Sequence, residues 1–308
     1  MRIVIIGGTG HIGSHLIPML TDAGIKVTVI ARGQTQQTLG NRTNLNIVQG
    51  AYQAEDPNWS RLLRETASDA DAVIDLLGVD LMATYEAIRR CCGHIIACGS
   101  VWMLGTPKRI PCSAEAQIEF WGEPYRQRWN VISQVLAMSA KDGARFTAIL
   151  PPNICGPGKI PLDTLGGRSI AVHRELARGS PVKLPVGPDV LIGPCDAEDV
   201  ARAFFLAVTK SNQAAGRVFN VGSAYALTAS EFVATYAEIY GVQIPIERIS
   251  WTEFCTSVVP EPFARYHFEA HMCPDITMTR EVLGYQPRFT PRETMARAVE
   301  WMRHQKLL

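Results

Sequence analysis

Short runs of apolar, β-branched residues alternate with longer amphipathic stretches through the first half of the chain. Such runs are typical of buried parallel strands, and the stretches between them have the spacing of helices that cover a sheet. The pattern predicts strands at 2–8, 26–32, 44–50, 71–78, 94–100 and 145–158, and helices at 14–24, 60–69, 80–92 and 123–141. This alternation is typical of an α/β protein with a doubly wound parallel sheet of the Rossmann type.

The pattern changes after about residue 155, where loops rich in Pro and Gly separate shorter elements. Helices are predicted at 197–210, 228–240 and 291–305, and one further strand at 217–222. We therefore predict a Rossmann domain over residues 1–154, to which 190–222 return, and a smaller C-terminal α/β substrate-binding cap. The cap would consist of 155–189 and 223–308 and would rest on the carboxyl ends of the strands, where open α/β sheets bind ligands.

Composition narrows the class of partner only slightly. The 308 residues carry a net charge of +1, which gives no electrostatic reason to expect nucleic acid or membrane partners. The first residues, MRIVIIGG, are too short for a signal sequence, and no run approaches the ~18 apolar residues of a membrane span. Eight cysteines show no metal-ligand spacing, so we expect reduced thiols, no bound metal and a cytoplasmic protein.

The segment GGTGHIG, residues 7–13, lies between the first predicted strand and its helix. Gly7 would allow a tight turn, Gly10 would let a pyrophosphate approach the backbone, and Gly13 would let the helix pack closely on the strand. The anion would then lie at the helix N-terminus, where free N–H groups and the helix dipole favour negative charge. This context predicts a dinucleotide-binding loop, and the alternative is a purely structural turn.

Further motifs follow this loop in a recognisable order. They are CGSVWMLG (98–105), PYRQRW (124–129), LPPNICGPG (150–158), CDAEDVARA (195–203), GRVFNVGSAYALTASEF (216–232) and LGYQPRFTPRETMARAVEWM (283–302). Together with the glycine loop, they resemble the extended short-chain dehydrogenase/reductase family, in particular its NAD-dependent epimerase/dehydratase group. The resemblance covers essentially the whole chain.

The resemblance implies an NAD(P)-dependent enzyme that acts by hydride transfer on a sugar, often nucleotide-linked, or on a small carbonyl or alcohol. It places Ser100 and Tyr125 at the catalytic positions of the family. It also implies a homodimer formed through the helices at 80–92 and 123–141. The residues expected to contact the cofactor are Gly7, Thr9, Gly10, His11, Ile12, Gly13, Leu77, Gly78, Pro151 and Asn153.

The catalytic motif departs from the family at Trp129, which occupies the place of the usual lysine. That lysine lowers the pKa of the tyrosine, and a tyrosine near pKa ~10 is a poor base at neutral pH without a nearby cation. Arg128 lies about 60° from Tyr125 on the helix surface and is our candidate for that charge. Two alternatives stay open: Arg128 supports a catalytic Tyr125, or Tyr125 stays protonated while Ser100 or a cap residue transfers the proton.

The adenosine end of the expected cofactor site departs as well. Many family members end the second strand with an acidic residue that binds the ribose hydroxyls of NAD, whereas this chain has Arg32 followed by Gly33. A guanidinium suits a 2′-phosphate, so we favour NADP; alternatively Arg32 stacks on the adenine and NAD binds. The aspartate often found after the third strand is also missing, with Ala51 after Gly50.

Other polar and aromatic residues have two possible roles. Asp75 is either a polar group near the cofactor or a hydrogen-bonded strand end, and we favour the second. His267 and His271 have the spacing of two metal ligands on a helix, but no third ligand is evident, and Pro260 and Pro262 indicate a loop. Four aromatic residues of the cap either line a substrate pocket or pack the cap: Trp251, Phe254, Phe263 and Tyr266.

Three functions are therefore compared. The first is an epimerase, dehydratase or reductase of the family, with an acid/base centre that lacks the usual lysine. The second is a redox-inactive regulator that binds NAD(P) through the same loop. The third is an RNA-binding relative of the fold, which the neutral charge and the absence of a Lys/Arg stripe disfavour.

Overall fold

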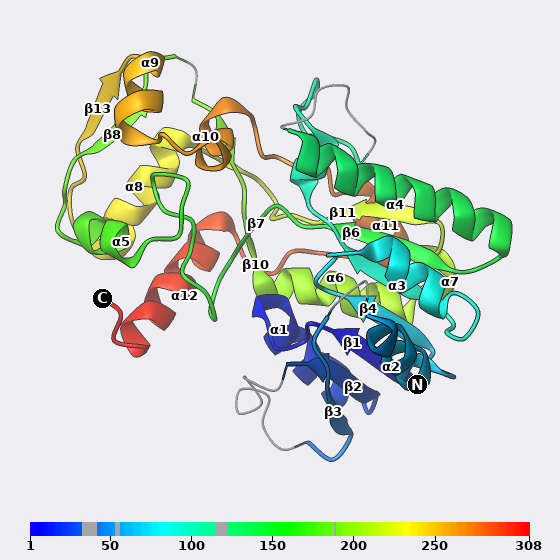
Figure 1. Cartoon of the computed structure of the whole chain (residues 1–308). Helices are drawn as coiled ribbons and strands as arrows, with labels where there is room; N and C mark the ends of the chain where they lie inside the picture. Colours follow the sequence, from blue (N-terminus) through cyan, green and yellow to red (C-terminus); the bar gives the residue numbers. More distant parts are fainter. Residues whose placement is uncertain (33–41, 53–55, 115–121, 188) are drawn as a thin grey trace.

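The computed structural model (Figure 1) describes residues 1–32, 42–52, 56–114, 122–187 and 189–308. A seven-stranded parallel sheet of order β11-β6-β5-β4-β1-β2-β3 forms its centre. The strands are β1 (Arg2–Ile6), β2 (Lys26–Ala31), β3 (Leu45–Gln49), β4 (Ala72–Asp75), β5 (Ile95–Cys98), β6 (Phe146–Leu150) and β11 (Arg217–Asn220). The strand order reverses between β1 and β4, which is the switch point where such sheets bind ligands.

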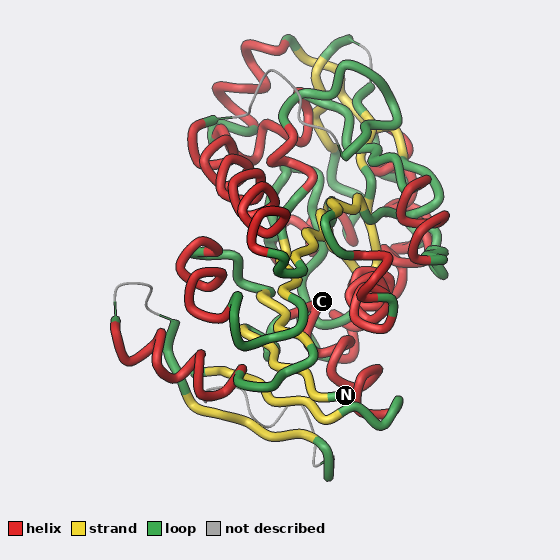
Figure 2. The backbone as a smooth tube through the Cα atoms, turned by 90° about the vertical axis from the view of Figure 1, so that its right-hand side faces the viewer, coloured by secondary structure: helices red, strands yellow, loops and turns green. Residues whose placement is uncertain are grey.

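Helices cover both faces of this sheet (Figures 1 and 2). One buried cluster joins the sheet to α1 (His11–Asp22) and α6 (Ala197–Thr209). A second cluster joins the other face to α2 (Pro57–Ala67), α3 (Leu81–Ile88) and α4 (Glu123–Asp142). The predicted Rossmann-type α/β class is therefore confirmed.

The glycine loop shapes the start of α1, which begins at His11 rather than at the predicted residue 14. Gly7 has φ +78°, a conformation that favours glycine. A Cβ at Gly13 would lie 2.0 Å from the carbonyl oxygen of Gly8, so only glycine lets the helix approach the turn this closely. The loop sequence thus determines where the helix N-terminus stands relative to β1.

The predicted strand at 145–158 is wrong as a single element. The strand β6 ends at Leu150, and a separate strand β7 (Asn153–Cys155) pairs with β10 (Pro194–Asp196) outside the central sheet. Pro151 and Pro152 interrupt the run because proline has no N–H to donate to a strand neighbour.

The segment from 194 to 220 runs through β10, α6 and α7 (Ser211–Ala214) and ends in β11, which pairs with β6. Most of the remaining C-terminal half surrounds its own buried cluster, whereas α11 (Thr277–Leu283) packs against the first cluster, through Leu283. The elements of this half are α5 (Ile170–Ala177), β8 (Val182–Pro185), β9 (Leu191–Ile192), β12 (Leu227–Thr228), α8 (Ala229–Tyr240), β13 (Ile246–Ile249), α9 (Trp251–Glu253), a π-helical turn (Phe254–Val258), α10 (Pro262–Glu269), α11 and α12 (Pro291–His304). The predicted domain limits stay a prediction.

The segment containing His267 is a helix, contrary to the predicted loop. Pro262 is the first residue of α10, a position where proline is favoured because the first N–H of a helix has no intrahelical partner. All eight cysteines are free thiols. Within the described ranges, no helix is both long enough and apolar enough to cross a membrane.

Candidate cofactor and catalytic site

The N-terminus of α1 is open to an anion. No side chain caps this helix, and its first turn carries no acidic residue. The first N–H groups of a helix lack intrahelical partners, and the dipole adds partial positive charge there. A Cβ at Gly10 would meet only the carbonyl oxygen of Gly7, at 3.6 Å, so the backbone is bare on this side. These donors and this open backbone fit a pyrophosphate.

Two cavities meet at this loop. The first, the β2 cavity, has a volume of about 360 Å³ and is lined by Ile6, Gly7, Thr9, Gly10, Ile30, Ala31, Arg32, Gly50, Tyr52, Trp59, Leu77 and Val79. The second, the β6 cavity, has a volume of about 270 Å³ and is lined by Gly7, Gly10, His11, Ile12, Gly13, Leu76, Leu77, Pro152, Asn153, Ile154, Lys159 and Arg168. They share Gly7, Gly10 and Leu77, so the two cavities adjoin at the glycine loop. An elongated ligand such as a dinucleotide would place one half in each.

Most of the predicted cofactor residues are brought together in these two cavities. The exceptions are Gly78, which lines a smaller neighbouring cavity, and Pro151, which is buried and whose carbonyl oxygen accepts from the N–H of Val101. Lys159 and Arg168 were missed, because neither belongs to a recognisable motif.

The β2 cavity has an aromatic wall, and none of the described residues that line it is acidic. The rings of Tyr52 and Trp59 lie 4.9 Å apart, and the Tyr52 hydroxyl donates to the carbonyl oxygen of Asp80 at 2.8 Å. Burial raises the pKa of Tyr52 to about 12, so the ring stays neutral. Arg32 is the exposed cation at the rim, and Gly33, which follows it, lies outside the described residues.

The β6 cavity contains two buried polar atoms without partners, His11 Nδ1 and Asn153 Nδ2. His11 Nε2–H donates to the carbonyl oxygen of Pro157 at 2.9 Å, which leaves Nδ1 as a bare acceptor. Burial, and secondarily the neighbouring His15, lowers the pKa of His11 to about 4, so the ring is neutral. The described residues thus leave one acceptor and one donor without partners on side chains that line this cavity.

Ser100 lies at the start of a 3₁₀ helix (Val101–Leu104) immediately after β5. Its hydroxyl oxygen accepts from the N–H of Trp102 at 3.3 Å, so the residue caps this turn. Accepting that bond leaves the hydroxyl hydrogen to donate elsewhere. Capping and substrate binding are therefore compatible at Ser100.

Tyr125 stands in the first turn of α4, half-buried against the cap. Its ring contacts those of Phe263 and Tyr266 edge to face, each with centroids 6.3 Å apart. Tyr266 also lies near the ring of Trp102, at 6.5 Å, and so links Tyr125 to the turn that Ser100 begins. Burial, and secondarily Tyr266, raises the pKa of Tyr125, and Arg128 only partly offsets the shift.

Arg128 reaches the end of β4 rather than the Tyr125 phenol. Its Nη2 donates to the carbonyl oxygen of Gly78 at 3.1 Å. Gly78, Cys98, Met103 and Arg128 line a cavity of about 190 Å³. Trp129 packs against the buried cluster beneath α4 and carries no charge. The site thus has a cation at one side of Tyr125 but none that dominates its pKa.

Asp75 is a hydrogen-bonded strand end, as the sequence favoured. Its Oδ1 accepts from the N–H groups of Leu77 and Gly78, both at 2.9 Å. Burial raises the pKa of this carboxyl group. The contact shapes the turn that presents Leu77 and Gly78 to the cavities.

His267 and His271 do not share a site. His267 lies in α10 with its ring edge-on to Trp102, 5.0 Å between centroids, and burial lowers its pKa to about 4. His271 lies beyond the helix, and its Nδ1 accepts from the N–H of Leu191 at 3.1 Å. Across the described part of the chain, no group of three His, Cys, Asp or Glu residues could hold a metal ion.

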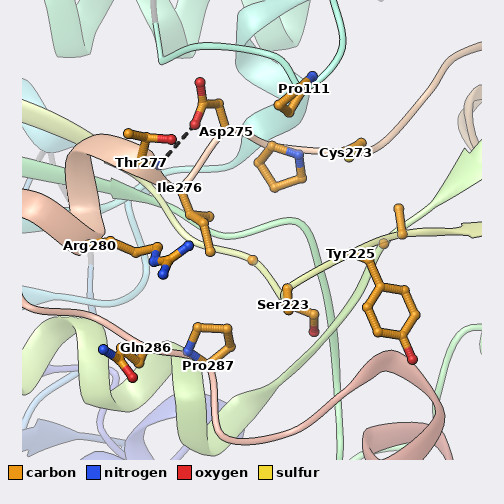
Figure 3. A pocket seen from close by; sticks show the side chains of 15 residues that line it. Pro111, Ser223, Tyr225, Cys273, Asp275, Ile276, Thr277, Arg280, Gln286 and Pro287 are labelled. Carbon is orange, nitrogen blue, oxygen red and sulfur yellow. Dashed lines mark hydrogen bonds between the residues drawn. The ribbon is translucent and has the colours of Figure 1, made fainter.

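A further cavity, of about 400 Å³, lies where the chain leaves β11 and enters α11 (Figure 3). Its walls include Ser223, Tyr225 and Arg280, with Arg280 and Gln286 on one side and Tyr225 on the other. Ser223 donates to the carbonyl oxygen of Pro194 at 2.7 Å. None of the residues lining this cavity lines the β2 or β6 cavity.

The fold and the glycine loop define a Rossmann-type protein whose C-terminal half adds a buried cluster of its own. The sequence model of the NAD dependent epimerase/dehydratase family matches residues 3–222, and the chain belongs to this family. UDP-D-apiose/UDP-D-xylose synthases 1 and 2 of Arabidopsis thaliana are each 26% identical over 190 residues, which is 54% of this chain and 47% of theirs. The chain thus matches about half the length of these curated relatives.

Solved structures share the fold across the whole chain. An epimerase from Methanothermobacter thermautotrophicus has a TM-score of 0.76 at 16% identity and covers 99% of this chain and 93% of its own. UDP-glucuronic acid 4-epimerase from Bacillus cereus, solved with UDP-glucuronic acid and NAD, has a TM-score of 0.75 at 16% identity and covers 99% of this chain and 100% of its own.

Proposed function

We propose that this protein is an NAD(P)-dependent enzyme that acts on a nucleotide-linked sugar by transient hydride transfer, as an epimerase, dehydratase or related oxidoreductase. The observation that carries the proposal is the pair of cavities that meet at the bare backbone of Gly10. The names of the curated relatives and of the Bacillus cereus structure support a nucleotide-linked sugar as the substrate class.

Within this proposal, the two cavities divide the cofactor. The adenosine half would lie in the β2 cavity against Tyr52 and Trp59, and the nicotinamide half would lie in the β6 cavity beside Pro152 and Asn153. Arg32 at the rim, and the absence of an acidic residue among the described residues of the lining, support NADP over NAD. When bound, the nicotinamide ring supplies a hydride acceptor and donor.

The chain's own residues would bind the reacting oxygen of the substrate and hold its proton. Tyr125 keeps its proton at the phenolic oxygen at neutral pH, because its pKa is raised, and it donates a hydrogen bond to that oxygen. Ser100 donates a second one through its remaining hydroxyl hydrogen. The aromatic residues Phe263 and Tyr266 of α10 cover Tyr125 and restrict the access of water to it.

A redox-inactive regulator that binds NAD(P) is the second candidate. It is favoured by one observation, namely that Trp129 replaces the lysine that would lower the Tyr125 pKa. Such a protein would use the same two cavities and need no positioned substrate oxygen.

A crystal soaked with NADP⁺ separates the two candidates. For an enzyme, Ser100 Oγ and the Tyr125 hydroxyl should both come within hydrogen-bond range of one point beside nicotinamide C4. A bound cofactor whose C4 faces neither hydroxyl would support the regulator. Cofactor that fails to occupy the Gly10 loop would contradict both.

A further inference from the structure

Two cations face the β6 cavity without a counterion. Lys159 and Arg168 both line it, and no acidic residue does. Neither side chain forms an ion pair with any residue in the described ranges. Arg168 is partly buried and Lys159 is exposed. Two cations that line one cavity without a negative partner repel each other, so their arrangement points to an anion that joins them.

Arg168 is held in place by backbone oxygen atoms. Its Nη1 donates to the carbonyl oxygen of Ile160 at 2.7 Å, and its Nη2 donates to that of Ile154 at 2.8 Å. These bonds orient the guanidinium but do not neutralise it. Burial lowers the pKa of Arg168, because removal from water disfavours the charged form.

The carboxylate of Asp163 raises the pKa of Arg168 but forms its hydrogen bonds with backbone N–H groups. Its Oδ1 accepts from the N–H groups of Leu165 and Gly167, at 2.8 and 3.0 Å, and its Oδ2 accepts from that of Ser169 at 2.8 Å. Asp163 therefore organises the loop that carries Arg168. It leaves the guanidinium free to face a ligand.

Lys159 lies on the same cavity wall and feels the charge of Arg168. Burial, and secondarily Arg168, lowers the pKa of Lys159. The N-terminus of α1 adds partial positive charge to the same cavity, through His11, Ile12 and Gly13. The three positive groups repel one another until an anion is bound.

The unpartnered polar atoms of the cavity narrow the kind of anion. Asn153 is only 6% exposed and its Nδ2 lacks an acceptor, while His11 Nδ1 lacks a donor. A hydroxyl group can satisfy both, because it donates and accepts. The cavity therefore suits a phosphate that is attached to a hydroxyl-bearing sugar.

We propose that Lys159 and Arg168 form an anion clamp that binds a phosphate group of a sugar phosphate in the cavity that the N-terminus of α1 also lines. This phosphate belongs either to the pyrophosphate of the cofactor or to the diphosphate of a nucleotide-linked substrate. The clamp deepens the proposed function and rests on it for the identity of the ligand, because the glycine loop lines the same cavity. Its affinity for an inorganic anion does not depend on that function.

Calorimetric titration of the nucleotide-free protein with inorganic pyrophosphate tests the clamp. The wild type should bind, and Lys159→Met and Arg168→Met should each weaken binding about 10- to 100-fold, the range of a charge-assisted contact. Arg280→Met is the matched control, because Arg280 lines the separate cavity of Figure 3 and its guanidinium forms no ion pair with the described residues. That variant should bind like the wild type.

Lys159→Met keeps the test valid if Arg168→Met unfolds, because the exposed Lys159 side chain forms no hydrogen bond with the described residues. Undiminished pyrophosphate binding in folded Lys159→Met, or loss of binding in Arg280→Met alone, would overturn the clamp. A wild type that does not bind pyrophosphate would overturn it too.

Two further titrations identify the source of the phosphate. If the clamp holds the cofactor, Lys159→Met should weaken NADP⁺ binding about 10-fold or more. If it holds the substrate, NADP⁺ binding should stay unchanged and UDP binding to the NADP⁺-saturated protein should weaken instead. A wild type that binds pyrophosphate but neither nucleotide would reject the proposed function and keep the anion site. If Lys159→Met binds NADP⁺ and UDP as tightly as the wild type does, the clamp is rejected and the proposed function is kept.

Discussion

Arg128 Nη2 and the carbonyl oxygen of Gly78 lie 3.1 Å apart, and this hydrogen bond joins α4 to the end of β4. The contact brings a cation to the edge of the site without directing it at the Tyr125 phenol. The family's lysine position, by contrast, is occupied by Trp129, which packs into the core. On α4, Arg128 is therefore the cation that lowers the pKa of Tyr125.

The first prediction concerns this cation. Arg128→Met should raise the Tyr125 pKa further, because it removes a charge that lowers it. Ultraviolet titration of tyrosine ionisation, with Tyr125→Phe to assign the signal, measures the change. Arg128→Lys is the control and should keep most of the effect of the positive charge. An unchanged Tyr125 titration in Arg128→Met would show that the charge does not reach the phenol.

The second prediction contrasts two glycines of the loop. Gly10→Val should fold, because a Cβ there meets only Gly7 O at 3.6 Å, but it should abolish cofactor binding by filling the place of the pyrophosphate. Gly13→Ala should instead destabilise the fold, by about 1–3 kcal/mol, because its Cβ would lie 2.0 Å from Gly8 O. Thermal unfolding separates these effects.

Trp59 gives the binding readout for these variants. It lies in the β2 cavity and is only 4% exposed, so a bound adenosine should change its fluorescence. Trp59→Phe should remove that signal and serves as the control. If folded Gly10→Val binds the cofactor with wild-type affinity, the pyrophosphate does not bind at this loop.

The third prediction concerns cofactor choice. If Arg32 binds the 2′-phosphate, NADP⁺ should bind more tightly than NAD⁺, and Arg32→Ala should cost NADP⁺ about 1.5–3 kcal/mol. The loss for NAD⁺ should be much smaller, because NAD⁺ lacks the phosphate. Equal losses for both cofactors would mean that Arg32 only stacks on the adenine.

The fold could be read from the sequence because its determinants are local. Apolar runs give the buried strands, and Gly7 and Gly13 stand at positions of the turn where a side chain would clash. The break between β6 and β7 was missed, although Pro151 and Pro152 lie at the break. The pairing of β7 with β10 could not be predicted, because it depends on a partner far along the chain.

The candidate site was only partly predictable, for the same reason. The ring of Tyr125 in α4 contacts that of Tyr266 in α10, and no local sequence pattern predicts a contact between residues so distant in sequence. The Arg168 loop is positioned by backbone carbonyl groups, which every residue has and no motif encodes. Pro262 was read as a loop residue although it begins α10, because proline suits both contexts.

The fourth prediction concerns assembly. The resemblance to the family implies a dimer through α3 and α4, so light scattering should give about twice the chain mass of 33.9 kDa. Ala137 is exposed on α4. Ala137→Arg should dissociate such a dimer, because it places a bulky charge in the contact. A wild-type monomer at micromolar concentration would contradict the prediction.

The last prediction returns to the acid/base role of Tyr125. Its pKa is raised by burial and by Tyr266, so the phenol is protonated at neutral pH, and ionisation sets in only above the usual value of ~10. Activity that needs the protonated phenol as a donor should therefore stay level up to about that pH and fall above it. A catalyst that needs the phenolate would instead gain activity as the pH rises.

The pH-rate profiles of the wild type, Tyr125→Phe and Trp129→Lys distinguish these cases. Tyr125→Phe should lose less than the roughly 10²–10⁴-fold expected for a general acid/base, because it removes only one hydrogen bond. Trp129→Lys should lower the Tyr125 pKa by placing a cation one turn further along α4, and it should create a rising limb well below pH ~10. If the wild type already shows that limb and Tyr125→Phe is inactive, then Tyr125 works as a base, and a cation nearer than Arg128 must lower its pKa in the cofactor-bound enzyme.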